Sequence, residues 1–375
     1  MSKLPNVGTT IFTIMSKMAN EHGAINLAQG FPNFSIDPRL DEAMKLGENH
    51  SAHQYAPMGG APDLLEAIVK MNKDSYGVTF DANREVLVTA GATQAIFTAI
   101  QSLVGPGDEV LILDPAYDCY DPSVLLAGGT PIHASLTEDY RPDWKAIFEK
   151  SSKKTKMIII NNPHNPCGTL WSKNDFQELE KLCSNYPDLL VLSDEVYEYI
   201  FFEKQFYSIK EFPILKERAI CVSSFGKTFH ITGWKIGYLT APEKIMIEIK
   251  KAHQFIVFCV NHGAQIALAK YIKIAEFNEI QRIHKNKRDL FIELLEKSKF
   301  ELLPCEGSFF ILASYAKISD LPDTVFCEEL TKKHGVAAIP ISVFNEDKRD
   351  DKIIRFCFAK EDATLIEASK RLCKI

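Results

Sequence analysis

Short apolar runs that alternate with helical segments restrict the fold of this chain more than any other feature. Five runs, at residues 85–89, 110–113, 157–160, 189–192 and 219–222, each end in polar or glycine residues. Between them, the spacing of Ile96, Ile100 and Leu103 predicts an amphipathic helix, and Ser172 with Asp175 predicts a helix N-cap. Buried strands separated by helices indicate an α/β fold, with a mostly parallel central sheet flanked by helices.

Residues suited to ligand binding follow the carboxyl ends of all five runs, at 91–93, 114–117, 161–168, 194–197 and 223–227. In open parallel sheets, ligands bind beyond the carboxyl ends of the strands. The sequence therefore predicts one shared site at this edge of the sheet.

The chain of 375 residues is too long for one compact core, so two units are expected. Residues 278–298 are rich in charge and predict a long surface helix, followed by strands at 309–312 and 353–356. We predict a large domain over residues 31–277 and a smaller α+β domain built from residues 1–30 and 278–375. The apolar run 255–260 predicts a core helix.

Composition and spacing disfavour several functional classes. The net charge is -6 with no basic tract, which disfavours nucleic-acid binding. No apolar stretch approaches the roughly 20 residues of a membrane span. Nine scattered cysteines without a Cys-x-x-Cys pair favour reduced thiols over a disulfide frame or a metal site. With no secretory signal pattern at the N-terminus, a cytoplasmic protein is expected.

The most informative segment is 223–238, Ser-Ser-Phe-Gly-Lys-Thr-Phe-His-Ile-Thr-Gly-Trp-Lys-Ile-Gly-Tyr. Burial of Lys227 beside a second cation, Lys235, would lower its pKa and free the amine for carbonyl chemistry. An exposed loop lysine is the alternative interpretation.

Three further segments extend this interpretation. Asp194, at the end of a buried strand, needs a cationic partner, and a protonated pyridine nitrogen would be one; a helix cap is the alternative. Tyr197 could hydrogen-bond the ring hydroxyl of such a ligand. The loop Asn-Asn-Pro-His-Asn-Pro-Cys-Gly-Thr at 161–169 is either a plain turn or part of the site. Residues 91–93 open a helix whose free N–H groups suit a phosphate.

Together these segments resemble the class I/II aminotransferases of fold type I, which use pyridoxal 5'-phosphate (PLP). The resemblance extends from Ile-Asn-Leu-Ala-Gln-Gly-Phe-Pro at 25–32 to Ile-Arg-Phe at 354–356. Lys235, where many relatives carry arginine, resembles the kynurenine/glutamine aminotransferase branch. Gln-Tyr-Ala-Pro-Met at 54–58 and Gly-Lys-Thr-Phe-His at 226–230 look similar to bacterial methionine aminotransferases of that branch.

The resemblance implies a role for each matching residue. Lys227 would hold PLP as a Schiff base and shuttle a proton, Asp194 would pair with the ring nitrogen, and Asn165 and Tyr197 would bind the ring oxygen. Tyr117 would stack on the ring, while Gly91, Ala92, Thr93, Ser224 and Lys235 would surround the phosphate. Arg355, with Gly30 and Asn165 nearby, would bind the substrate carboxylate. Tyr55 would reach the phosphate of the other subunit of a homodimer.

The implied reaction moves an amino group from an L-amino acid to a 2-oxo acid. Methionine, aromatic amino acids or glutamine are the expected donors. A cysteine-conjugate or cystathionine β-lyase is the alternative, because it would use the same Lys227 and Asp194. A PLP-binding regulator is disfavoured, because the sequence shows no basic helix-turn-helix.

Overall fold

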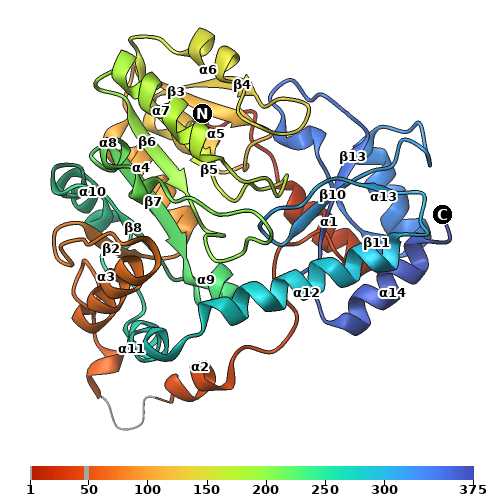
Figure 1. The fold of residues 1–375 in the computed structure, drawn as a ribbon, viewed down its shortest axis with the longest axis horizontal. Helices are drawn as coiled ribbons and strands as arrows, with labels where there is room; N and C mark the ends of the chain where they lie inside the picture. Colours follow the sequence, from red (N-terminus) through yellow and green to blue (C-terminus); the bar gives the residue numbers. More distant parts are fainter. Residues whose placement is uncertain (1, 46–49) are drawn as a thin grey trace.

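Seven strands form the central sheet of the computed structural model, which describes residues 2–45 and 50–375 (Figure 1). Their order is β2-β8-β7-β6-β5-β3-β4. The bounds are β2 (Val86–Thr89), β3 (Glu109–Asp114), β4 (Thr130–Ser135), β5 (Thr155–Asn161), β6 (Leu190–Asp194), β7 (Ala219–Ser224) and β8 (Gly237–Thr240). Neighbouring strands from β7 to β4 are parallel, and β8 is antiparallel to both of its neighbours.

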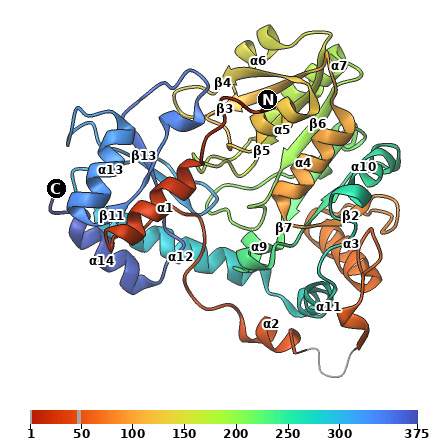
Figure 2. The same cartoon turned by 180° about the vertical axis from the view of Figure 1, so that it is seen from behind.

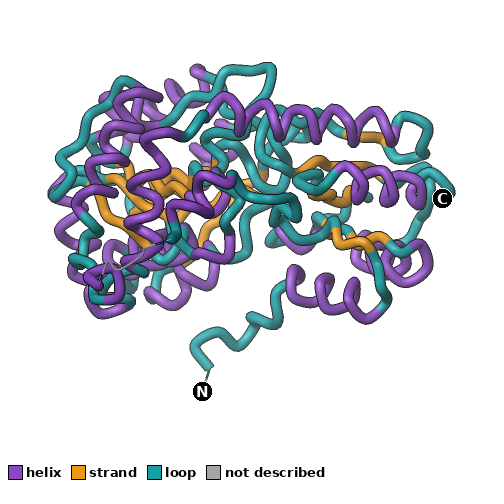
Figure 3. The backbone as a smooth tube through the Cα atoms, turned by 90° about the horizontal axis from the view of Figure 1, so that it is seen from below, coloured by secondary structure: helices purple, strands orange, loops and turns teal. Residues whose placement is uncertain are grey.

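Helices cover both faces of this sheet. α4 (Ala92–Leu103) crosses the face seen in Figure 2, and α7 (Lys173–Asn185) lies on the face seen in Figure 1. Viewed along the sheet edge, helices lie on both sides of the strands (Figure 3). The predicted fold class, a mostly parallel α/β sheet flanked by helices, is confirmed.

A separate four-stranded antiparallel sheet lies toward the C-terminus, in the order β12-β13-β10-β9. Its strands are β9 (Glu301–Leu302), β10 (Phe310–Ser314), β12 (Ile339–Pro340) and β13 (Ile353–Cys357). The N-terminal segment joins this part of the chain, because β1 (Ile25–Asn26) pairs with β11 (Val336–Ala337) and α1 (Ile11–Glu21) packs on α13 (Asp323–His334). The division into 31–277 against 1–30 with 278–375 stays a prediction.

The long helix expected at 278–298 is α12 (Phe277–Leu295), which runs from near α9 towards α14, on which it packs (Figure 1). The other α-helices are α2 (Pro38–Ala43), α3 (Pro62–Tyr76), α5 (Tyr120–Ala127), α6 (Trp144–Lys150), α8 (Pro213–Lys216), α9 (Phe225–Thr228), α10 (Glu243–Ile256), α11 (His262–Tyr271) and α14 (Asp362–Leu372).

Local chemistry explains why several elements begin where they do. Ser172 accepts from the Asp175 backbone N–H, and the Asp175 carboxylate accepts from the Ser172 N–H, which completes the predicted N-cap of α7 as a capping box. β2 is buried along its whole length, as the apolar run at 85–89 predicts for a strand covered on both faces.

The prediction of a core helix over 255–260 is wrong. α10 ends at Ile256, and Phe258 has a positive φ of 64°, which an α-helix does not accommodate. Phe255 is 87% exposed and Phe258 is 47% exposed, so most of the apolar run lies at the surface, and Val260 at its end is buried. Its composition reflects a surface patch and not the packing of a core.

A buried ionic network lies beneath the turn that follows β6. Lys210 Nζ is 2.9 Å from a Glu198 oxygen and 3.7 Å from a Glu195 oxygen, and all three side chains are at most 3% exposed. The Tyr76 hydroxyl donates to Glu198 at 2.6 Å, and the Ser208 hydroxyl donates to Glu195 at 2.6 Å. One ammonium therefore compensates two carboxylates that adjoin Asp194 and Tyr197 in sequence.

Within residues 2–45 and 50–375, no helix combines the length and apolar character needed to cross a membrane. All nine cysteines are unpaired. The described part of the chain contains no group of three or more histidine, cysteine or acidic side chains arranged to hold a metal ion.

Candidate active site

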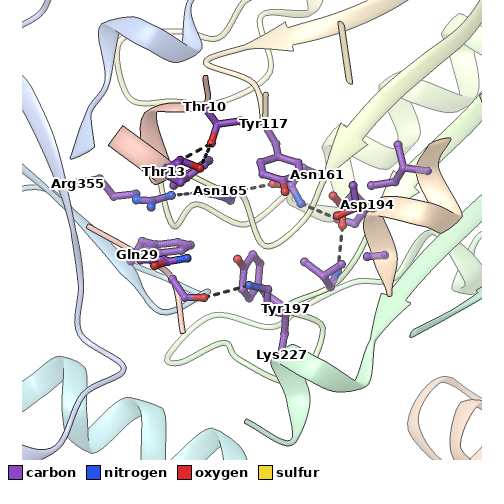
Figure 4. A pocket seen from close by; sticks show the side chains of 17 residues that line it. Thr10, Thr13, Gln29, Tyr117, Asn161, Asn165, Asp194, Tyr197, Lys227 and Arg355 are labelled. Carbon is purple, nitrogen blue, oxygen red and sulfur yellow. Dashed lines mark hydrogen bonds between the residues drawn. The ribbon is translucent and has the colours of Figure 1, made fainter. Parts of the chain in front are cut away.

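A cavity of about 360 Å³ lies at the carboxyl ends of the parallel strands, where they face α1 and the C-terminal sheet. Its walls come from segments far apart in the sequence (Figure 4). The lining residues are Thr10, Phe12, Thr13, Gln29, Gly30, Ala92, Thr93, Ile96, Tyr117, Asn161, Asn165, Asp194, Val196, Tyr197, Lys227, Phe310 and Arg355. The predicted convergence of strand-end residues on one site is therefore observed.

Lys227 reaches into this cavity from α9, the short helix that follows β7 (Figure 4). Its Nζ donates to the Gly30 carbonyl oxygen at 3.2 Å and lies 5.3 Å from the centre of the Phe309 ring. Burial lowers the pKa of Lys227 to about 8, and the positive charges of Arg355 and Lys235 act in the same direction. A substantial fraction of this amine is thus neutral near pH 8, as nucleophilic or base chemistry requires.

Asp194 ends β6 on the side of the cavity opposite Arg355 (Figure 4). The carboxylate is 4% exposed and accepts from the Tyr120 hydroxyl at 2.8 Å and from the Val196 N–H at 3.3 Å. Burial raises the pKa of Asp194 to about 6, while the hydrogen bond from Tyr120 opposes that rise. At neutral pH the carboxylate is mostly ionised and lacks an ion-pair partner among the described residues.

Arg355 lies on β13 at the other end of the cavity. Its Nη1 donates to Asn165 Oδ1 at 2.7 Å and its Nη2 donates to the Ala28 carbonyl at 2.8 Å. The guanidinium carbon lies over the Phe310 ring, 3.7 Å from the ring centre. Burial lowers the pKa of Arg355 to about 10. Nε is buried with no hydrogen-bond partner, and within the described chain no acidic side chain pairs with this cation. A buried guanidinium without a carboxylate partner favours an anionic ligand.

A second anion-binding feature lies at the start of α4. Gly91, the N-cap residue, has a φ of 78° and leaves the first turn without a side-chain cap, so the backbone N–H groups are available to a ligand. A Cβ at Gly91 would lie 3.2 Å from Lys235 Nζ, which places that ammonium beside the helix N-terminus. Ser224, the N-cap of α9, likewise makes no capping bond with its side chain.

Most of the residues predicted from the sequence lie together here. The residues that line the cavity are Gly30, Ala92, Thr93, Tyr117, Asn165, Asp194, Tyr197, Lys227 and Arg355. Gly91 directly precedes Ala92, with Lys235 Nζ beside it, and Ser224 lies at the end of β7, three residues before Lys227. Tyr55 does not line the cavity: it is 81% exposed and packs edge-on against Phe258 with ring centres 5.4 Å apart.

Other lining residues were not predicted. Phe12, Thr13 and the N-cap residue Thr10, at the start of α1, form one wall. Tyr120 lies behind Asp194 and was not predicted either. The N-cap pattern at Thr10, whose side chain accepts from the Thr13 N–H, could have located α1 but not its position against the cavity.

The chain is similar in sequence to a known protein family and to several named proteins. Residues 22–372 match the family described as Aminotransferase class I and II. A methionine aminotransferase of Escherichia coli is 46% identical over 99% of this chain and 97% of its own length. A kynurenine–oxoglutarate transaminase 3 of Homo sapiens is 33% identical, with 99% and 89% covered.

Solved structures show the same similarity. A crystal structure from Escherichia coli, reported with a methionine aminotransferase function, superposes with a TM-score of 0.97 over 100% of this chain and 99% of that chain. An N-succinyldiaminopimelate aminotransferase from Mycobacterium tuberculosis is 34% identical, with a TM-score of 0.96 over 100% and 99%. The fold is therefore that of the fold-type-I enzymes expected from the sequence.

Proposed function

Because the chain belongs to the class I and II aminotransferases, we propose that it transfers the amino group of an uncharged L-amino acid, methionine first, to a 2-oxo acid, with PLP as cofactor. The observation that carries this proposal is that Lys227 and Arg355, neither of which forms an ion pair with a described residue, line one cavity. Lys227 supplies a neutral amine at moderate pH, and Arg355 supplies a site for the α-carboxylate. An amino acid held by Arg355 extends toward Lys227.

The residues present fit PLP. Lys227 would hold the aldehyde carbon, Asp194 would accept from the ring nitrogen, and Tyr117 would stack on the ring. Asn165 and Tyr197 would bind the ring oxygen, and the phosphate would lie among Gly91, Ala92, Thr93, Ser224 and Lys235. The uncapped start of α4 beside Lys235 Nζ supports the phosphate assignment, because both features favour an anion. When bound, PLP supplies an electron sink and carries the amino group between the two substrates.

Lys227 has the properties of the base in this reaction. A pKa of about 8 lies close to neutral pH, where a general base is most effective. Its Nζ would take the proton from the substrate Cα and then donate it to the cofactor carbon that receives the amino group. The Gly30 carbonyl, which accepts from Nζ at 3.2 Å, keeps the amine directed into the cavity.

The lining of the cavity supports an uncharged substrate side chain. Lys227 and Arg355 are the only cations among the described residues that line it, so a side-chain carboxylate has no partner there. Phe12 lies 6.4 Å from Tyr117 between ring centres, and together they form an apolar wall suited to a thioether or an aromatic ring.

Arg355→Lys should lower kcat/KM for methionine by about 10- to 100-fold, mainly through a higher KM. Lysine keeps the positive charge but lacks the planar guanidinium, which can donate two parallel hydrogen bonds to one carboxylate. Steady-state kinetics measure the effect. The control is Arg349→Lys, at an exposed arginine that pairs with Asp351, which should leave KM unchanged. Equal KM values for Arg355→Lys and the wild type would contradict the assignment of Arg355 as the residue that binds the substrate α-carboxylate.

The proposed function is tested by incubating the PLP-loaded enzyme with single amino acids and several 2-oxo acids. We expect methionine, followed by aromatic amino acids and glutamine, to give the matching 2-oxo acid and a new amino acid in equal amounts. Release of pyruvate, ammonia and a thiol from cystathionine, without exchange between methionine and 2-oxo acids, would instead identify a β-lyase.

We further propose a homodimer in the cytoplasm, in which Tyr55 reaches the phosphate site of the partner. Exposed apolar side chains gather where α10 ends, at Tyr55, Phe255, Ile256 and Phe258, and exposed patches of this kind favour contact with another chain. The nine unpaired cysteines support a reducing compartment.

A further inference from the structure

The carboxylate of Asp194 has one side-chain hydrogen-bond donor within the described chain, the hydroxyl of Tyr120. The two atoms are 2.8 Å apart, and both side chains are at most 4% exposed. The same hydroxyl makes no other hydrogen bond to the described residues. Tyr120 was not among the residues that the sequence indicated, and its partner lies 74 positions away.

The position of Tyr120 is fixed from two sides. It is the first residue of α5, and its backbone N–H donates to the Tyr117 carbonyl at 3.2 Å. Its ring meets the Tyr117 ring edge-on at an angle of 81°, with ring centres 5.8 Å apart. The hydroxyl is therefore held against Oδ2 of Asp194, while Oδ1 accepts from the Val196 N–H at 3.3 Å.

A buried tyrosine hydroxyl usually has a hydrogen-bond partner, so the contact could be simple satisfaction of a polar group. The identity of the partner, Asp194, indicates a role beyond this. Asp194 faces the cavity, is buried, and forms no ion pair with the described residues, so its charge depends on hydrogen bonds. A donor to a carboxylate favours the ionised form, and burial favours the protonated form. Among the described residues, Tyr120 is the side chain that opposes protonation through a hydrogen bond, and the charge of Lys227 acts in the same direction from a greater distance.

We propose that Tyr120 is a positioning residue that acts through Asp194, keeping this carboxylate ionised and turned toward the ring nitrogen of PLP. The inference rests on the proposed function. With the hydroxyl present, the proton between the ring nitrogen and Asp194 stays on nitrogen, and a charge-assisted hydrogen bond holds the ring. Without it, Asp194 binds the proton more strongly, the ring loses positive charge, and it stabilises a carbanion less well.

Tyr120→Phe tests this inference by removing one oxygen atom. On the apoprotein, titration with PLP should give a Kd about tenfold higher than that of the wild type, since hydrogen bonds to charged groups contribute at this level. In the loaded enzyme, kcat should fall about 10- to 100-fold, while KM for methionine changes less than about twofold, because Arg355 binds the substrate at the other end. The matched control is Tyr315→Phe, which loses a buried-ring hydroxyl that donates to the Leu321 carbonyl at 2.8 Å outside the cavity.

A double-mutant cycle separates a positioning role from a structural one. In an Asp194→Asn background, Tyr120→Phe should leave the Kd for PLP unchanged, because the carboxylate through which it acts is gone. An equal loss of affinity in both backgrounds, or a Tyr120→Phe variant that matches Tyr315→Phe, would overturn the inference. A wild-type protein that binds no PLP would instead overturn the proposed function.

Discussion

Replacing Lys227 with alanine should lower kcat for methionine transamination by at least about 10⁴-fold. A positioned acid or base contributes roughly 10²- to 10⁴-fold to a proton transfer, and this variant also loses the amine that would hold the cofactor. Stopped-flow and steady-state assays measure the rate, and absorbance near the visible edge reports attachment of PLP. Both signals should disappear while the far-UV circular dichroism spectrum is retained.

A closely matched lysine provides the control. Lys250 is also half-buried, its pKa is also lowered by burial, and its Nζ also donates to a backbone carbonyl, that of Asn83. It lies on α10 outside the cavity, so Lys250→Ala should keep the wild-type rate. Methylamine should partly restore the transamination rate of Lys227→Ala, because a free amine can enter the space left by the lysine side chain and take the Cα proton. Wild-type turnover by Lys227→Ala would contradict the mechanism.

Replacing Lys210 with methionine should destabilise the fold by about 3–5 kcal/mol, the effect expected when one partner of a buried ion pair is removed. Glu195 and Glu198 would remain buried without their cation. Denaturant or thermal unfolding at a fixed PLP concentration measures the loss. Adding Glu198→Gln to this variant should recover part of the lost stability, because it removes one of the two buried carboxylates left without a cation.

The comparison for Lys210 is a lysine with the same two-carboxylate surroundings at the surface. Lys285 lies 3.2 Å from Glu203 and 2.6 Å from Asp289, and its side chain is 42% exposed. Because water screens such pairs, Lys285→Met should cost less than about 1 kcal/mol. Similar losses for the two variants would mean that burial of the network contributes nothing beyond an ordinary surface pair.

The sequence predicted the parts of the fold in which pattern and packing agree. Strands buried on both faces are continuous apolar runs, which is why β2, β3, β5, β6 and β7 could be located. β4 could not, because it is an edge strand with Pro131 and His133 within it, and its burial is mostly partial. β8 is only four residues long and follows directly on the lysine segment, so no separate apolar run marks it.

The same limit applies to the cavity. Residues that belong to strand ends could be assigned, because parallel strands bring their carboxyl ends to one edge. Phe12 and Tyr120 could not, since their roles depend on contacts that form only in three dimensions, against Tyr117 and Asp194. The run at 255–260 misled because apolar composition alone does not distinguish a core from a surface patch.

The hydrogen bond between Arg355 and the Ala28 carbonyl joins residues 327 positions apart. On a ribosome that adds about 5–20 residues per second, roughly 15–65 s pass between the synthesis of these two residues. During that interval α1 and β1 have been made without α13 and β11, the elements on which they pack. The central sheet can form on the nascent chain, but catalytic competence is acquired last, after almost the entire polypeptide has emerged.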